Sequence, residues 1–322
     1  MKYWLFLSAA CASLAAAAET YAFTHMADAS AGEWLGKGFF VAASDEDNLL
    51  RVYRLPQGGP PVFNWDPTPY VRLDSKSPEM DIEGSAKVGE IIYWITSHAP
   101  NREGKPRPNR KRFFATRVSA NDGHPSVAFV GQPVATLMED LARDARYTRF
   151  DLAAAALLPP KTPGSLNIEA LCDTPDGGLL IGFRSPVPQG LALLVPLANP
   201  AEVVSGRPPF FGDPLLVDLG GNGFRAMARV GDVYRIISGS PLAGGRPRVY
   251  RWDGRGKPEP DPLPDLPADV TPEGLVAAEI GGRAALLVLS DDGARLVDGR
   301  PAKNHQDPAR RTFRAFQLSK EP

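Results

Sequence analysis

The sequence predicts an all-β protein with the fold of a β-propeller, with five blades expected and six as the alternative. A short sequence motif occurs four times, at residues 81–86, 167–172, 223–228 and 271–276. Each copy is followed by a Gly-containing turn, a hydrophobic strand and a few polar residues that end the strand, here called the polar stop. A repeat of this length indicates stacked or radially arranged units. The chain also combines 31 Gly and 33 Pro with 43% hydrophobic residues. That composition is expected of many short strands and turns around packed cores.

The strand patterns follow one another in the order that blades require. Residues 38–43 and 49–55 form two strand patterns on either side of the acidic turn 44–48. A further strand pattern follows each repeat, at residues 113–118, 191–195, 248–252 and 313–318. Glu169, Arg225 and Glu273 are spaced about one four-stranded blade apart. We expect strand 313–318 to pair into the first blade and close the ring, which limits free sheet edges.

One interval, from Glu83 to Glu169, is too long for a single blade. It contains a helical pattern that begins near Thr136, where Thr136 and Glu139 have the spacing of a capping box. We interpret this stretch as a short helical insertion within or between blades. A degenerate extra blade, which would bring the number to six, is the alternative.

The first 18 residues have the pattern of an export signal, with a basic start, an apolar run and small residues before Glu19. We therefore expect residues 19–322 to form a single propeller domain that is periplasmic or secreted, works as a monomer and does not insert into a membrane. Removal of residues 1–18 takes away Cys11 and leaves Cys172 as the only cysteine. In its strand context Cys172 is expected to be a buried hydrophobic residue without a disulfide.

The topology of a propeller gathers the repeated polar positions at one end of the central channel. In each repeat the Glu or Arg precedes the innermost strand, and the next antiparallel strand returns the chain to the same end. Glu83, Glu169, Arg225 and Glu273 should therefore ring the channel mouth. One interpretation is that these charges pair with one another and with backbone amides. The other is that Glu83, Glu169 and Glu273 hold a hard cation such as calcium, or that Glu83 acts as a general base.

The loop of residues 97–112 leaves the same mouth and carries six Lys or Arg against one Glu. Because guanidinium groups suit phosphate, sulfate and carboxylate groups, we expect an anionic ligand to be bound by Arg102, Lys105, Arg107, Arg110, Arg184 and Arg225. The alternative is a solvated charge run that pairs with acidic loops such as 45–47. His98, where this loop begins, is the candidate general acid or base. The net charge of −1 and the isolation of the basic loop argue against nucleic-acid binding.

Several of these segments together resemble a bacterial family known as domain of unknown function 3616. The resemblance lies in residues 81–84, in residues 93–98 leading into the basic loop, and in residues 167–171, 184–186 and 273–275. It implies no activity. More distantly, the Glu-Gly strand openings resemble those of esterase-like propellers related to phytase. Arg225 departs from that pattern, because an acidic residue would be expected at its position.

Two functions remain in competition at this point. The first is a binding protein for an anionic small molecule or glycan at the channel mouth. The second is a calcium-assisted hydrolase, for which phosphate esters are the candidate substrates, Glu83, Glu169 and Glu273 the metal ligands, and His98 and Glu83 the acid and base. A scaffold for another exported protein is a third hypothesis without a sequence signature. The fold alone does not choose among them.

Overall fold

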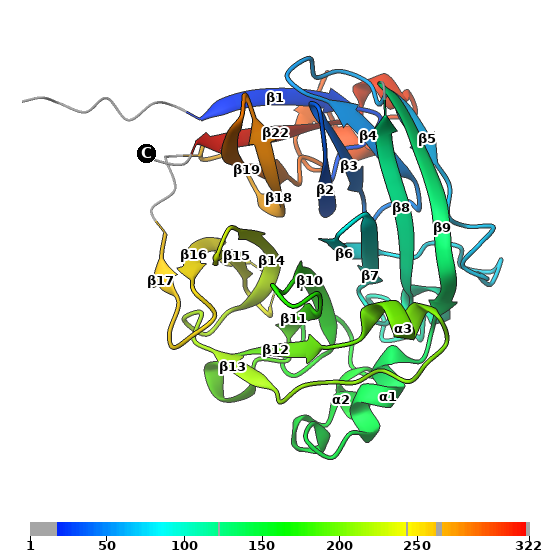
Figure 1. Ribbon diagram of the computed structural model, residues 1–322, viewed down its shortest axis with the longest axis vertical. Coiled ribbons are helices and arrows are strands. Elements are labelled where there is room, and N and C mark those ends of the chain that lie inside the picture. Colours follow the sequence, from blue (N-terminus) through cyan, green and yellow to red (C-terminus); the bar gives the residue numbers. More distant parts are fainter. Residues whose placement is uncertain (1–17, 122, 243, 262–265, 320–322) are drawn as a thin grey trace, which may run out of the picture.

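The computed structural model is a ring of five four-stranded antiparallel sheets around one central axis (Figure 1). It describes residues 18–121, 123–242, 244–261 and 266–319. The prediction of an all-β propeller with five blades is confirmed, and the alternative of six blades is wrong. The expected export signal falls almost wholly on residues 1–17, as does Cys11, and so lies outside the described residues. No helix in the described part of the chain is long and apolar enough to cross a membrane.

Each blade begins with its innermost strand. The first blade consists of β2 (Ala31–Gly36), β3 (Phe39–Ala43), β4 (Leu50–Arg54) and β5 (Phe63–Trp65). The second consists of β6 (Ile82–Val88), β7 (Ile91–Thr96), β8 (Phe113–Asn121) and β9 (His124–Val134). The third consists of β10 (Asn167–Asp173), β11 (Leu179–Ser185), β12 (Ala192–Leu197) and β13 (Leu215–Val217). The fourth consists of β14 (Gly223–Val230), β15 (Val233–Gly239), β16 (Arg248–Trp252) and β17 (Glu259–Pro260). The fifth consists of β18 (Pro272–Ile280), β19 (Arg283–Ser290), β22 (Thr312–Ser319) and β1 (Glu19–Thr24).

The innermost strands β2, β6, β10, β14 and β18 contact one another in that order around the axis, and β18 returns to β2 (Figure 1). The hairpin of β20 (Leu296–Val297) and β21 (Arg300–Pro301) forms a small separate sheet before β22. Short 3₁₀ helices occupy the connections, at Pro108–Arg110, Thr148–Phe150, Pro188–Gly190, Ala302–Asn304 and Pro308–Arg310.

The expected helical insertion lies between β9 and β10, on the outside of the ring (Figure 1). It holds α1 (Leu137–Arg143) and α2 (Leu152–Ala155), and a third short helix, α3 (Pro200–Val204), lies between β12 and β13. Thr136 precedes α1 as predicted, but the predicted capping box between Thr136 and Glu139 does not form. The Thr136 hydroxyl bonds Asp140 Oδ2 at 2.9 Å, and Glu139 instead accepts a bond from Lys111 Nζ at 2.7 Å.

Both faces of each inner sheet are buried against neighbouring blades, which explains why the strands are hydrophobic throughout. In β7, Ile92 and Trp94 pack toward the first blade with residues such as Val41, whereas Tyr93 and Ile95 pack toward the third blade. The alternation of side chains along a strand thus supplies two cores at once. Cys172 belongs to a core of the third and fourth blades and is 2% exposed, so its predicted burial is confirmed.

The ring is closed by the N-terminal strand, not by pairing of the last strand with the first blade. β22 pairs with β19 within its own blade, and β1 adds to β22 as the outermost strand, with Phe23 opposite Phe313. The expectation that residues 313–318 pair into the first blade is therefore wrong. Phe23 is fully buried and its ring lies 5.1 Å from that of Phe40 and 5.2 Å from that of Phe313, so β1 ties the first and last blades together.

We predict that Phe23→Ala lowers the free energy of unfolding by about 3–5 kcal/mol, because it leaves a cavity at the closure of the ring. Urea denaturation followed by tryptophan fluorescence measures the change. Phe210→Ala is the matched control, since Phe210 is 63% exposed. Equal losses in the two variants would contradict the role of β1.

Candidate functional site

The four repeated polar residues occupy equivalent places in their blades. Where the innermost strand pairs with the second strand, the ladder skips one residue in each of the last four blades, and the skipped residues are Glu83, Glu169, Arg225 and Glu273. A skipped residue of this kind is a β-bulge, which re-aims a side chain at a strand end. The repeat in the sequence is therefore a repeat of bulges facing the channel.

The polar stops lie across the ladder from these bulges, as the alternating strand directions require. Thr96 pairs with Ile82, Ser238 with Phe224 and Ser290 with Pro272. Each stop therefore brings the loop after the second strand to the same mouth. That geometry places Asp45 and Asp291, which follow the stops Ser44 and Ser290, beside the bulged residues of the ring.

Two members of the ring are neutralised by arginine. Arg225 Nη2 lies 2.5 Å from Glu273 Oε1, and both side chains are about nine-tenths buried. Arg184 Nη1 lies 2.6 Å from Glu169 Oε1, which also accepts a bond from Asn167 Nδ2 at 2.7 Å. Glu83, by contrast, forms no hydrogen bond or ion pair with any residue that the structure describes. Mutual pairing therefore accounts for only part of the ring.

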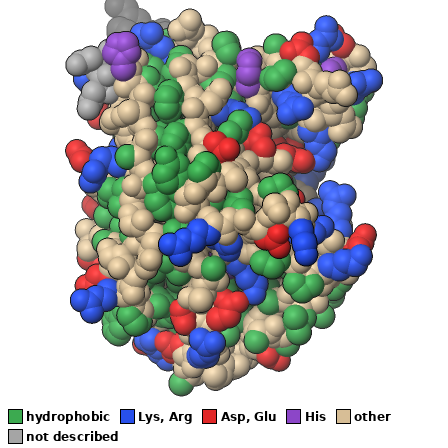
Figure 2. Space-filling model, turned by 90° about the vertical axis from the view of Figure 1, so that its right-hand side faces the viewer, with side chains coloured by type: hydrophobic (Ala, Val, Ile, Leu, Met, Phe, Trp, Pro, Cys, Tyr) green, Lys and Arg blue, Asp and Glu red, His purple; other side chains and the backbone are tan. Residues whose placement is uncertain are grey.

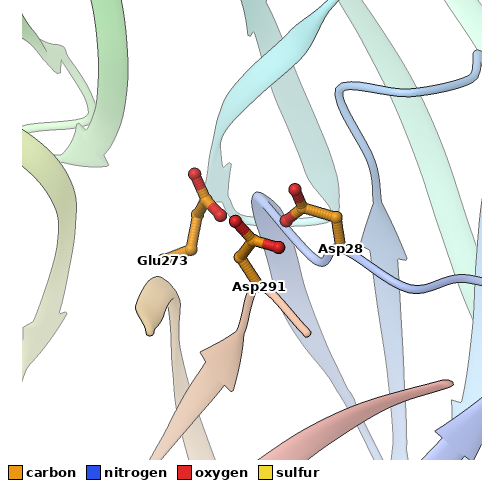
Figure 3. A group of neighbouring side chains, drawn as sticks. All are labelled: Asp28, Glu273 and Asp291. Atoms are coloured by element: carbon orange, nitrogen blue, oxygen red, sulfur yellow. The ribbon is translucent and has the colours of Figure 1, made fainter. Parts of the chain in front are cut away.

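A first group of three carboxyl groups, the seam triad, consists of Asp28, Glu273 and Asp291. Their side chains converge from the loop before β2, from β18 and from the end of β19 (Figure 3). One oxygen of each lies within 4.8 Å of the others. Two oxygens that both lie about 2.4 Å from one ion are at most about 4.8 Å apart, so this spacing fits a shared calcium ion. When both groups are ionised, Oδ1 of Asp28 and Oε2 of Glu273 are buried without a hydrogen-bond partner among the described residues, whereas a protonated Asp28 bonds to Glu273.

A second group, the loop triad, consists of Asp45, Asp81 and Glu83, with the same spacing. Asp81 has a positive φ of 63° and is held by a hydrogen bond from the Ser97 hydroxyl and by Arg110 Nη1 at 3.0 Å. Glu83 and Asp45 form no ion pair with a cation among the residues that the structure describes. The loop triad therefore contains three carboxyl groups and one paired arginine, Arg110, so its negative charge is only partly neutralised.

The pKa values of the two triads reflect this excess. Burial raises the pKa of Asp28 well above its usual range, and the neighbouring carboxylate of Glu273 raises it further. Burial likewise raises the pKa of Glu83, and the carboxylates of Glu169 and Asp81 add to the rise. Burial raises the pKa of Glu273 as well, although Arg225 opposes that effect. The electrostatics of the mouth thus favour protonated carboxyl groups or an added cation.

The structure brings together some of the expected metal ligands and not others. Glu273 belongs to the seam triad and Glu83 to the loop triad, whereas Glu169 belongs to neither and is occupied by Arg184. The sequence reasoning missed Asp28, Asp45, Asp81 and Asp291 as candidate ligands. A signal was present for two of them, because an Asp follows the serine stop in both Ser44-Asp45 and Ser290-Asp291.

Most cations proposed to bind an anion already have partners. Arg110 Nη2 lies 2.6 Å from Glu79 Oε1 in addition to its contact with Asp81. Lys105 pairs with Glu103 at 2.7 Å on the surface. Arg107 donates to Ser77 Oγ at 2.7 Å, and Arg102 is exposed. Figure 2 shows basic and acidic side chains scattered among one another on the side of the molecule that carries β8 and β9.

His98 does not hydrogen-bond to Glu83 or to any other described residue through its ring. It is 2% exposed, its backbone φ is +55°, and both ring nitrogens are buried without a partner in the described part of the chain. Burial lowers its pKa to about 3, and the positive charges of Lys111 and Arg112 act in the same direction. The imidazole is therefore neutral at ordinary pH, and it lines a pocket against the helical insertion.

A further carboxyl group, that of Glu33, is partly buried on the innermost strand β2. Burial raises the pKa of Glu33 to about 8, and the carboxylate of Asp173 adds to the rise while Lys87 opposes it. Asp173 is itself paired with Arg229, whose Nε lies 3.0 Å from its carboxylate. Glu33 is thus a proton-binding group that the sequence reasoning did not identify.

Comparison with known proteins shows the fold but not a family. No protein-family model matches the chain, and no curated protein does. The chain is similar to the Malassezia sympodialis allergen Mala s 1, with 10% identity, a TM-score of 0.50 and coverage of 94% of this chain and 96% of that one. It is also similar to Myxococcus xanthus glutaminyl cyclase, with 12% identity, a TM-score of 0.48 and coverage of 95% and 97%. The chain is likewise similar to aldose sugar dehydrogenase from Streptomyces coelicolor, with 12% identity, a TM-score of 0.46 and coverage of 94% of this chain and 99% of that one.

The likeness to Mala s 1 shows the fold alone. At 10–12% identity none of these comparisons carries residue roles over to this chain. The resemblance to domain of unknown function 3616 stays a prediction.

We predict that Glu33→Gln becomes more stable relative to the wild type as pH rises. The folded-state pKa of about 8 exceeds the ordinary value of 4.5, so between those two pH values the unfolded chain ionises Glu33 while the folded protein keeps it protonated, and the wild type loses stability as pH rises. Below about pH 4.5 the two proteins should differ least. Urea denaturation at pH 4.5, 6 and 8 tests this, with Glu90→Gln on the exposed turn as control. A difference that does not change with pH would contradict the assignment.

Proposed function

We propose that the channel mouth binds a divalent cation, with calcium as the best match, and that the bound cation recruits an anionic small molecule or glycan. The observation that carries this proposal is the seam triad, where three carboxyl groups converge within 4.8 Å and two of their oxygens, in the ionised groups, are buried without a partner among the described residues. Oxygen-only ligands at this spacing suit calcium. The loop triad offers a second place for such an ion.

The arrangement of the arginines supports a cation-mediated mode of anion binding. Arg110, Arg184 and Arg225 each lie within hydrogen-bond distance of a carboxylate. An anion that bound these groups directly would have to displace a buried partner and leave its charge uncompensated, which is costly. A metal ion held by the triads would instead keep open positions for oxygens of the ligand.

The chemistry of the mouth also fits the proposed export of the protein. Extracellular modules bind calcium with dissociation constants of roughly 10⁻⁴–10⁻³ M. A site built partly from carboxyl groups with raised pKa values suits such moderate affinity, because binding must displace protons. Calcium-assisted hydrolysis remains the alternative function.

Calorimetric titration of calcium tests the proposal. We predict saturable binding to the wild type, with affinity at least about tenfold weaker at the seam triad in Asp28→Asn and at the loop triad in Glu83→Gln, since each triad loses an anionic ligand. Calcium should raise the melting temperature of the wild type more than that of either variant. Asp298→Asn and Glu90→Gln replace exposed carboxylates and serve as matched controls.

The second arm of the experiment separates the two functions. Inorganic phosphate and sugar phosphates are titrated with calcium and with a chelator, and release of nitrophenol from p-nitrophenyl phosphate is followed in parallel. Anion binding that needs calcium without turnover supports the binding protein, and calcium-dependent turnover supports the hydrolase. Absence of calcium binding, or unchanged affinity in both triad variants, overturns the proposal.

A further inference from the structure

A pocket separate from the channel mouth lies between the basic loop and the helical insertion. It has a volume of about 270 Å³, and α1, α2 and the loop after β7 contribute to its wall. Apolar side chains supply most of the lining, among them Met138, Leu152 and Leu166. Leu157, which is 68% exposed, also belongs to the lining, so the pocket reaches the surface. An apolar cavity of about 150 Å³ is enough to admit a benzene ring.

One polar residue of this wall, His98, has no side-chain hydrogen-bond partner within the described ranges. The His98 ring is 2% exposed, and neither of its nitrogens bonds any residue that the structure describes. A neutral imidazole carries one N–H donor and one acceptor, and burial of both without a partner is unfavourable. The backbone at His98 lies in the left-handed region, with a φ of 55°. Non-glycine residues held in that region are concentrated at ligand sites.

The charges around the pocket do not cancel. Lys111 and Glu139 both line it and neutralise each other across 2.7 Å. Arg107 lines it as well, donates to the Ser77 hydroxyl, and forms no ion pair with any described residue. The pocket therefore combines an apolar body with one guanidinium group that has no ion-pair partner in the described part of the chain.

We propose that this pocket binds a small monocarboxylate with an aromatic body. The carboxylate faces Arg107, and the aromatic ring packs against the apolar wall beside His98. Charge-assisted hydrogen bonds to a planar guanidinium group favour a carboxylate over a neutral polar group. The few convergent polar groups within a mainly apolar pocket are what small-molecule sites commonly provide.

Calorimetry on the full chain with benzoate as the probe tests this assignment. Benzoate should bind saturably, whereas acetate, which lacks the aromatic body, and benzyl alcohol, which lacks the charge, should each bind at least about tenfold more weakly. A chelator should leave benzoate binding unchanged, which distinguishes this pocket from the metal-binding mouth. Saturable binding of benzyl alcohol as tight as that of benzoate would overturn the assigned ligand class.

Two pairs of variants locate the binding. Arg107→Gln should weaken benzoate binding at least about tenfold, and Arg143→Gln on α1, whose side chain is 75% exposed and outside the lining, should not. Ala156→Leu, which fills the pocket, should weaken both benzoate and benzyl alcohol, whereas Ala154→Leu on the exposed side of α2 should not. Unfolding midpoints of all four variants establish that the proteins are folded.

Nuclear magnetic resonance of ¹⁵N-histidine-labelled protein provides a readout at the imidazole itself. Benzoate should shift the ring-nitrogen signals of His98, assigned through His98→Gln, and leave those of His25, His124 and His305 in place. No saturable benzoate binding, equal binding in Ala156→Leu and wild type, or an unchanged His98 signal at saturation would each overturn the proposal.

Discussion

The pairing of β1 with β22 is the constraint on which the rest of the structure depends. It makes the last blade out of both ends of the described chain, with Phe23 directly across from Phe313. The chain then turns into the first blade, and Asp28 forms a backbone bridge with Asp291. The seam triad therefore joins carboxyl groups from opposite ends of the sequence. Closure by β1 and this bridge together hold Asp28 beside Glu273.

Burial of like charges is the second physical theme. The bulges of the last four blades aim their side chains into one channel, and two of the four are balanced by arginines. The remaining acidic side chains are held close together by backbone geometry, although their pKa values rise as a result. The loop that holds Asp81 through Ser97 continues directly into His98. The channel mouth and the pocket thus lie on successive residues of one loop.

The blade count, the helical insertion and the equivalence of Glu83, Glu169, Arg225 and Glu273 could be predicted, because each depends on a pattern repeated along the chain. Asp28 could not, since the first blade lacks the repeated motif and Asp28 reaches the mouth only through ring closure. The alternation within residues 313–318 predicts a strand but does not say which strand pairs with it. Similarly, the basic loop is balanced by Glu79 and Glu139, which are near it in space and distant in sequence.

A ring closed without a covalent bond has one weak place, the junction of its two ends. In this fold the seam triad spans that junction, with one carboxylate before the first blade and two in the last. A cation bound there would link the first and last blades, because the two blades could not separate at this point without releasing the ion. The concentration of the ion would then set how often the first and last blades separate, and with it the rate at which proteases cleave the opened chain.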